Sequence, residues 1–457
     1  MNSSLLSISL PSKYSSFLPR FSKLATVSIF SNMMVPLAGI CDTAFLGHLA
    51  DIRYLAGVIL ASILFDYLYR VLKFFRNSTN SMTANAVGQE DDAGILLALL
   101  RSGLVALAIA VVILLLQYPI QKLGFAILSG SPDIETFGID YYNARIWGAP
   151  AVLLNFVLIG WFLGREMNSW VLAISLMGNG SNVIMDYIMI NQWGWDSMGA
   201  GLATALSQYL AFFVALVGVC LTIQWKELPK VSKQVFDREA LKSTVVLKGN
   251  ILTRYIAMIT AYSIFTNLSA GMGTEVIAKN GLLLQIVLLS QFTVNGIGLT
   301  TQTLIGNFRG KGQTEQMLPL LSVSLFTSLT IASLFTAVSI FFPETVFGLL
   351  TNHTVISQSV AEYTIWLLPL LTFGACAFML EGYVIGLKES AKLRNSAIIA
   401  LAGFFVPLAA LAWYLQNNHL LWLSLTMYMV GLVVSLGVQV PGIQHSQNLK
   451  LQTQGAK

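Results

Sequence analysis

The stretch LATVSIFSNMMVPLAGICDTAFL, residues 24–46, contains a single charged side chain, Asp42. About 20 predominantly apolar residues are enough for an α-helix to cross the hydrocarbon core of a bilayer. Similar apolar runs recur along the 457 residues, of which 55% are hydrophobic and only 10% are charged. A soluble domain usually carries about 25% charged residues. The sequence therefore predicts an all-α, polytopic membrane protein.

Twelve transmembrane helices are expected. Their predicted ranges are 24–46, 55–87, 95–118, 136–163, 170–191, 199–224, 249–268, 276–306, 317–341, 357–387, 395–414 and 420–440. Alternate connecting segments (both tails and the loops near 88–94, 164–169, 225–248, 307–316 and 388–394) hold 17 Lys and Arg, whereas the other set holds only Arg53 and Lys122. Basic residues mark the cytoplasmic side, so both termini are predicted to be cytoplasmic.

The chain shows signs of an internal duplication. The segment TANAVG (83–88) resembles TQTLIG (301–306) at a shift of 218, and IGWFLGRE (159–166) resembles EGYVIGLK (381–388) at a shift of 222. Six spans per half give both halves the same orientation, which is a parallel repeat. The predicted organisation is a tail (1–23), a six-helix bundle (24–224), a basic linker (225–248), a second bundle (249–440) and a tail (441–457).

The sequence contains none of the motifs that are typical of nucleotide-driven pumps, hydrolases or metal sites. The chain has no G-x-x-x-x-G-K-[ST] phosphate loop, no H-E-x-x-H and no G-x-S-x-G, and it has only four histidines. Its three cysteines show no metal-binding spacing. Neither a nucleotide-driven pump nor an enzyme is expected, and no cofactor is expected beyond a coupling ion.

Polar residues inside the first six spans form stripes. Asn179, Asn182 and Asp186 lie at helical spacing in one span, and Thr204 lies in the next. A carboxylate in lipid is costly and needs a proton, a cation or a positive partner, so Asp42 and Asp186 are the leading functional candidates. Ser and Asn also serve as hydrogen-bonding contacts between helices, and for Asn179 that interpretation is favoured.

The second half offers fewer acids. Glu381 is predicted either to be a second ion-coupling site or to anchor Lys279 or Arg254. In the second span, Asp66 with Arg70 is interpreted as a structural pair at helical spacing, with Lys73 and Arg76 continuing the same spacing.

The chain resembles the multidrug and toxic compound extrusion (MATE) family, in particular its DinF-like branch. The segments that carry the resemblance are GICDTAFLGHL (39–49), FFRNSTNSMTANAVGQ (74–89), IGWFLGRE (159–166), NVIMDYIMI (182–190), WGWDSMGAGLATALSQY (193–209), NGLLLQ (280–285) and NGIGLTTQTLIG (295–306). The resemblance implies a V-shaped pair of bundles that exports amphipathic, often cationic compounds by alternating access against H⁺ or Na⁺. The chain departs from the branch at Asn295 and Gln302, where members often have acids.

The resemblance also implies roles for individual residues. Asp42 matches the essential acid of the first span, Asn182 and Asp186 match a pair in the fifth, and Thr204 matches a hydroxyl in the sixth. Tyr141 matches a cavity tyrosine and Glu381 an acid of the tenth span. H⁺ is favoured as the coupling ion, and the oxygens of Asp42, Asp186, Asn182 and Thr204 offer Na⁺ the alternative site.

The predicted substrate site comprises Tyr141, Asn179, Glu381, Arg254 and Lys279. Because Arg254 and Lys279 are basic, an organic-anion exporter is the leading alternative, and a flippase for lipid-linked precursors is less favoured because intramembrane basic residues are few. We expect small organic substrates, no nucleic-acid partner and a monomer in the bilayer. The expected location is a prokaryotic inner membrane, with a plastid membrane as the alternative.

Overall fold

The computed structural model describes residues 14, 16–47, 51–128, 132–348, 359–444 and 447, and the regular structure of this part is helical throughout. The first half contains α2 (Leu18–Gly47), α3 (Ile52–Leu72), α4 (Phe74–Gly88), α5 (Asp92–Leu115), α6 (Gln117–Leu128), α7 (Pro132–Arg145), α8 (Ala149–Gly164), α9 (Asn168–Asp186), the π-helix η2 (Tyr187–Gln192) and α10 (Asp196–Thr222). The short α11 (Leu228–Ser232) follows. The second half contains α12 (Arg238–Gly271), α13 (Thr274–Lys311), α14 (Met317–Phe341), α15 (Pro343–Gly348), η5 (Ala361–Trp366), α17 (Leu367–Gly386), α18 (Ser390–Ile399), the π-helix η6 (Ala400–Phe405), α19 (Val406–Leu415) and α20 (Asn418–Gly437).

The predicted spans agree closely with these helices. Among the described residues, ten helices are long and apolar enough to cross a membrane. The other two predicted spans, 170–191 and 249–268, fall on α9 with η2 and on α12, which are helical but more polar. Helix α12 begins at Arg238, where the side chain of Asp237 caps it by accepting a 2.8 Å hydrogen bond from the backbone N–H of Ala240. The second part of the linker predicted at 225–248 is therefore helix.

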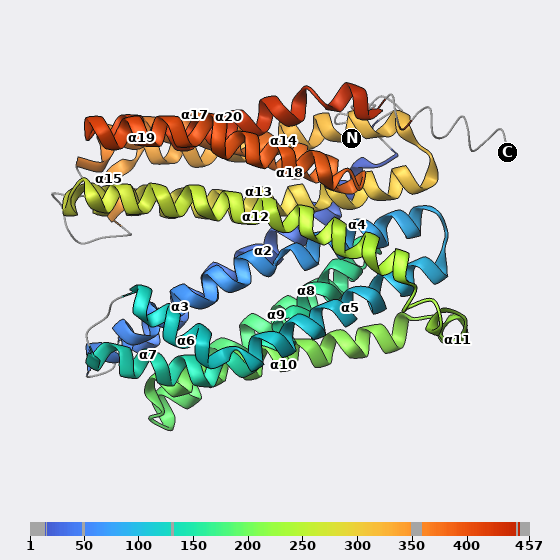
Figure 1. Ribbon diagram of the computed structural model, residues 1–457, viewed down its shortest axis with the longest axis horizontal. Coiled ribbons are helices and arrows are strands. Elements are labelled where there is room, and N and C mark those ends of the chain that lie inside the picture. Colours follow the sequence, from blue (N-terminus) through green and yellow to red (C-terminus); the bar gives the residue numbers. More distant parts are fainter. Residues whose placement is uncertain are drawn as a thin grey trace, which may run out of the picture.

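The two halves form two bundles arranged as a V (Figure 1). At one end, which we call the joined end, the ends of α4, α13 and α17 contact one another. At the opposite, splayed end, α7 of the first bundle lies well apart from α15 of the second (Figure 1). This is the V-shaped, two-bundle architecture that the family resemblance implies.

Helix α2 lies between the bundles rather than within the first one alone. It packs against α9 of its own half and against α13 of the other half. The approach to α13 depends on Gly296, because a Cβ there would lie 2.7 Å from the backbone nitrogen of Ile29. Helix α2 also continues through Pro36, which cannot donate the helical hydrogen bond to the carbonyl group of Asn32.

Helix α4 is polar in sequence and nevertheless buried. Thirteen of its 15 residues are buried, among them Arg76, Asn77, Asn80 and Asn85. It packs against α5 and α8 of the first bundle and against α12, α13 and α17 of the second. Because protein surrounds α4, its polar groups can hydrogen-bond to neighbouring helices instead of facing lipid.

The backbone repeats between the two halves at the larger of the two shifts seen in the sequence. Glycines of α8 and α17 pack on equivalent carbonyl groups: Gly160 on that of Arg76 and Gly382 on that of Gly298. Left-handed backbone also recurs at this shift, at Glu166 (φ 56°) and Lys388 (φ 57°). The pairing of 159–166 with 381–388 is therefore confirmed. The pairing of 83–88 with 301–306 is wrong, because at the shift of 222 residues 83–88 are equivalent to residues 305–310, about one helical turn further along. Moving one helix by a full turn leaves its pattern of apolar and polar faces almost unchanged, so the sequence alone did not reveal the difference.

The close approach at Gly160 predicts a sharp effect of a single methyl group. A Cβ on Gly160 would collide with the backbone carbonyl of Arg76, so Gly160→Ala should force α8 and α4 apart and destabilise the protein by roughly 1–3 kcal/mol. Thermal unfolding in detergent measures this. Gly103→Ala in α5 is the matched control, because nothing lies within 4 Å of a Cβ there. Equal effects of the two changes would contradict this account of α4–α8 packing.

Candidate functional site

A buried polar group lies inside the first bundle, between α9 and α10. Asn182 donates from Nδ2 to Oδ2 of Asp186 at 2.9 Å and to Oγ1 of Thr204 at 3.5 Å. Asp186 is fully buried and Asn182 is nearly so. Since Asn182 and Asp186 are one turn apart on α9, the helix itself places both side chains on the face toward α10. The structure thus brings together three of the four predicted coupling residues.

Asp42, the fourth coupling candidate, belongs to α2, and its side chain lies outside the described part of the structure. Helix α2 packs against α9, and the hydroxyl groups of Ser31 and Ser175 form a hydrogen bond between these two helices. The helix that carries Asp42 is therefore held against the helix that carries Asp186.

Two predicted substrate residues have protein partners. Asn179 donates from Nδ2 to the backbone carbonyl of Ser175 at 2.8 Å, within its own helix. The hydroxyl of Tyr141 is buried and accepts hydrogen bonds from Nη1 of Arg145 and from Oγ of Ser62. The guanidinium of Arg145 lies over the ring of Phe65, 4.6 Å from its centroid, which makes this region a cation–aromatic cluster.

The three predicted charges of the second half do not form one site. Arg254 of α12 donates from Nε to Oε1 of Glu381 at 2.6 Å and from Nη2 to Oε2, and both side chains are buried. Lys279 instead pairs with Glu275 at 2.7 Å, one turn away on α13. Of the two anchoring partners considered for Glu381, the structure shows Arg254. The bidentate contact joins α12 to α17 within the second bundle.

The basic residues around the start of α4 depart from the expected pattern. Asp66 and Arg70 form the predicted pair at 3.8 Å. Arg76, however, reaches two other helices: Nη1 donates to Oδ1 of Asn32 in α2 at 2.9 Å, and Nη2 donates to Oδ1 of Asn295 in α13 at 3.3 Å. Lys73 lies over the ring of Phe292 in α13. Helical spacing alone could not reveal these contacts, because they come from helices distant in sequence.

Lys248 lies in the predicted basic linker, so its burial does not follow from the sequence. In the structure it is only 3% exposed, and Nζ donates to Oγ of Ser78 at 2.8 Å and to Oγ of Ser102 at 3.2 Å. It therefore ties α12 of the second bundle to α4 and α5 of the first.

The joined end is closed by polar contacts between the bundles. Gln302 donates to the carbonyl of Asn77 at 2.7 Å, and Thr303 donates to Oδ1 of Asn80 at 2.9 Å. Near the helix ends, Lys388 donates to Oδ1 of Asn85 at 2.8 Å, and Arg20 donates to Oδ1 of Asn307 at 3.2 Å. Asn85 and Asn307 occupy the same position of the two repeats, so the two halves use equivalent amides as acceptors. Arg20 also pairs with Glu166.

Two glycines allow the backbones to cross at this end. A Cβ on Gly88 would collide with the carbonyl of Asn307, and a Cβ on Gly310 with that of Asn85. Gly88 and Gly310 are again equivalent positions of the two repeats. The joined end is therefore a close backbone contact around an approximate two-fold relation, reinforced by side-chain hydrogen bonds.

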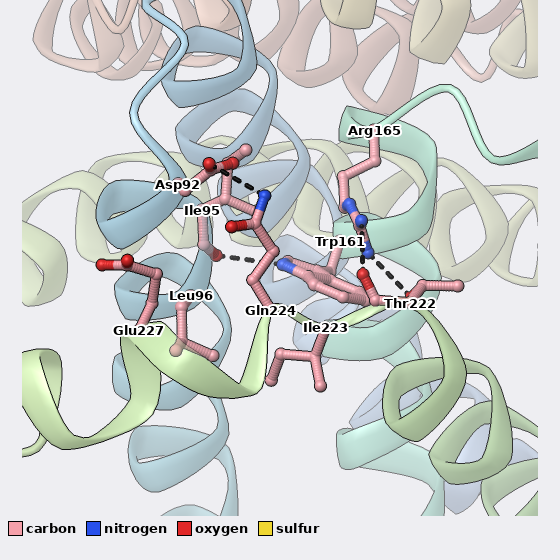
Figure 2. A pocket seen from close by; sticks show the side chains of 9 residues that line it. All are labelled: Asp92, Ile95, Leu96, Trp161, Arg165, Thr222, Ile223, Gln224 and Glu227. Carbon is pink, nitrogen blue, oxygen red and sulfur yellow. Dashed lines mark hydrogen bonds between the residues drawn. The ribbon is translucent and has the colours of Figure 1, made fainter.

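A small pocket at the same end of the first bundle lies between α5, α8 and α10 (Figure 2). Arg165 donates to the hydroxyl and the carbonyl of Thr222, both at 2.9 Å, and Trp161 donates to the carbonyl of Ile95 at 3.0 Å (Figure 2). Gln224 donates to Asp92 across the pocket at 2.9 Å. These contacts fix the helix ends within one bundle. Among the described residues, no group of three or more His, Cys, Asp or Glu side chains could hold a metal ion.

Comparisons with known proteins agree with this architecture. The family model described as MatE matches residues 28–188 and 251–413, one match in each half. DNA damage-inducible protein F of Escherichia coli K12 is 30% identical over 406 residues, covering 89% of this chain and 88% of that protein. The probable multidrug resistance protein NorM of Thermotoga maritima is 23% identical over 338 residues, covering 72% of this chain and 71% of that protein. A crystal structure of MATE in complex with MaL6 superposes with a TM-score of 0.84 at 18% identity, covering 93% and 96% of the two chains.

The two-bundle fold and these matches define a class of membrane transporter. The chain belongs to the MATE family, and its similarity to the Escherichia coli protein places it in the DinF-like branch. It is therefore a multi-pass integral membrane protein of a family of efflux transporters, and the double match supports the internal duplication.

The burial of Lys388 at the joined end predicts a dependence of stability on pH. Burial, with Arg309 nearby, lowers the pKa of Lys388 from 10.5 to about 8. The unfolded chain then binds more protons than the folded chain between about pH 8 and 10.5, so folded stability should rise with pH in that window. Thermal unfolding at pH 7, 8, 9 and 10 should show that Lys388→Gln loses part of this rise. Lys392→Gln, a change of a more exposed lysine on α18, is the control; an unchanged pH profile in the Lys388 variant would refute the assignment.

The buried pair of Arg254 and Glu381 predicts non-additive effects of mutation. Arg254→Met or Glu381→Gln alone leaves one buried charge without its partner, so each should destabilise the protein by roughly 3–5 kcal/mol. Combining Arg254→Met with Glu381→Met removes both charges and should cost less than Arg254→Met alone. Unfolding temperatures in detergent give the comparison. If Glu381→Gln is as stable as wild type but uncoupled in transport, Glu381 is an ion-coupling residue and not an anchor.

Proposed function

We propose that this transporter exports amphipathic organic compounds, cationic ones included, in exchange for an inward-moving cation. Asp42, Asp186, Asn182 and Thr204 are the proposed coupling residues. The observation that carries the proposal is the fully buried carboxylate of Asp186, to which Asn182 donates while also reaching Thr204. A carboxylate buried inside a membrane bundle is stabilised by binding a proton or a cation, which is the reaction that ion coupling requires.

The proposed mechanism couples protonation to a movement of α2. Protonation of Asp42 removes a charge from the membrane interior and gives the acid a proton to donate to Asn182 or Thr204. Helix α2 then bends near Pro36, where one helical hydrogen bond is already missing. Because α2 contacts both bundles, its bending can change how they meet. Asp42 and Asp186 are proposed to titrate as a coupled pair.

Alternating access is proposed to work by opening and closing the joined end. Arg165, Arg309 and Lys388 lie in the segments predicted to be cytoplasmic, and the joined end contains these segments. On this orientation, we propose that the structure is a state closed toward the cytoplasm and that both termini are cytoplasmic. Export then requires the contacts of Asn85 with Lys388 and of Asn307 with Arg20 to break and re-form in each cycle.

H⁺ is proposed as the coupling ion in preference to Na⁺. A protonated Asp42 needs only one acceptor nearby, whereas Na⁺ needs several oxygen ligands at once. The side chains of Asp186, Asn182 and Thr204 offer such oxygens, so Na⁺ is the alternative. We further propose that the chain works as a monomer without a cofactor, in a prokaryotic inner membrane or, as the alternative, a plastid membrane.

An organic-anion exporter is the second candidate. The observation in its favour is that Lys73 and Arg76, near the middle of the long Arg53–Gly88 span, have no carboxylate within ion-pair distance among the described residues. The substrate charge therefore needs an experiment of its own.

Transport in proteoliposomes tests the coupling proposal. A fluorescent cationic dye should move when a pH gradient is imposed, and Asp42→Asn should abolish this movement, because an amide cannot carry a proton. A Na⁺ gradient without a pH gradient is applied in parallel. Asp140→Asn, a change of an exposed acid in α7, is the matched control and should leave transport intact.

Each result leads to a distinct conclusion. Gradient-driven transport by Asp42→Asn at the wild-type rate would overturn the role of Asp42. Transport driven by Na⁺ alone would replace H⁺ as the coupling ion. If the dye moves with neither gradient, the cationic substrate class is wrong, and anionic compounds become the next substrates.

A further inference from the structure

The junction of α2, α4 and α13 contains a group of polar side chains whose capacity to donate hydrogen bonds is only partly used within the described part of the protein. These side chains, which we call the junction donors, are Ser28, Asn32, Lys73 and Arg76. Ser28 and Asn32 are one turn apart on α2, and Lys73 and Arg76 are three residues apart at the start of α4. Such spacings place each pair on one face of its helix. Arg76 links the two pairs through its 2.9 Å hydrogen bond to Asn32.

Three polar atoms of this group lack a partner among the described residues. They are Nε of Arg76, Nδ2 of Asn32 and Oγ of Ser28, all buried. The three side chains are 9%, 6% and 2% exposed, respectively. Leaving a buried donor unsatisfied costs about 1–3 kcal/mol, and more for a charged group. Each of these three atoms is positioned inside the junction where it could donate a hydrogen bond to a bound acceptor.

The charge of the side chains at the junction also favours a bound acceptor. Nearby, Glu381 pairs with Arg254 and Asp66 with Arg70. Lys73 and Arg76 have no such carboxylate in the described structure, because Arg76 donates to neutral amide oxygens and Lys73 lies over the ring of Phe292. Two basic groups three residues apart on a helix repel each other when both are charged. A bound anion would offset both the repulsion and the cost of burying two cations.

We propose that the junction donors bind the anionic group, such as a carboxylate, of an amphipathic organic substrate. The site lies between the bundles, since Arg76 contacts α2 and α13 while belonging to α4. A guanidinium suits a planar carboxylate, and the Lys73 ammonium adds a second positive charge. The inference deepens the second candidate function, the export of organic anions, by assigning it a binding site at the bundle junction. It rests on the proposed function only in calling the bound compound a substrate.

Binding without any gradient tests the site separately from transport. The probe is tritiated 1-naphthaleneacetate, and its uncharged analogue 1-naphthaleneacetamide serves as the matched ligand. The purified full chain is held in nanodiscs of phosphatidylcholine, which has no net charge. We expect saturable binding of the acid, at least tenfold tighter than binding of the amide. No preference for the acid would overturn the proposal, even if coupled transport of another compound is found.

Two variants separate binding from folding. Arg76→Gln should weaken binding of the acid at least tenfold and leave binding of the amide unchanged. Asn32→Asp provides a built-in carboxylate that can pair with Arg76, so it should fold at least as well as wild type and still lose binding of the acid. Arg165→Gln removes a similar guanidinium that donates to Thr222 outside the junction, and it should bind like wild type.

Several results would count against the site. Equal losses for the acid and the amide in Asn32→Asp would show that the junction is only structural. Undiminished binding of the acid in both Arg76→Gln and Asn32→Asp would place the anion elsewhere. If one-third phosphatidylglycerol in the nanodiscs abolishes binding of the acid, a lipid headgroup and not a substrate is the occupant of the junction.

Discussion

The contact on which the rest of the structure depends is the crossing of α4 and α13 at Gly88 and Gly310. The absence of a Cβ on both residues lets two helix backbones approach until each glycine faces a carbonyl of the other helix. Close backbone approach at small residues is a principal way in which membrane helices associate, because apolar side chains gain no hydrophobic free energy by leaving lipid for one another. Once these backbones are fixed, Asn80 and Thr303 come within hydrogen-bonding distance across the bundles.

The same crossing explains why a polar helix can be buried at membrane depth. Helix α4 has almost no surface toward lipid, because α5 and α8 cover one side and α12, α13 and α17 the other. Its side chains then meet polar groups of the second bundle: Ser78 those of α12, Asn80 those of α13 and Ser81 those of α17. Such hydrogen bonds are each modest in energy, so a set of them can be broken and re-formed without a large barrier. That property suits a contact that the proposed transport cycle must open.

Helix α2 connects the two functional regions of the molecule. It packs against α9, which carries Asn182 and Asp186, and against α13, whose Asn295 contacts Arg76. The proposed ion site and the proposed anion site therefore share one helix, with Asn32 and Asp42 about three turns apart on it. A change of charge at Asp42 can be transmitted to the junction of the bundles through α2 without a separate relay.

Much of the fold could be predicted from the sequence. Apolar runs of about 20 residues fix the helices in lipid because only an internally hydrogen-bonded backbone can cross it, and α14 begins and ends at the predicted residues 317 and 341. The one-turn spacing of Asn182 and Asp186 placed them on one face of α9, and the structure shows their hydrogen bond. The duplication was also visible, although the helical period allowed one of its two matches to slip by a turn.

Only the tertiary structure decided which charges meet between different helices. Glu381 could be assigned to Lys279 or Arg254 from the sequence, and the packing of α12 against α17 selects Arg254. Lys248 looked like a linker residue and is buried between bundles, while Lys73 and Arg76 are turned toward α13 and away from an acid. Helical periodicity determines which side chains share a face of one helix, but it carries no information about which other helix that face will touch. For this protein the sequence determined the helices and their polar faces, and the three-dimensional packing determined the partners.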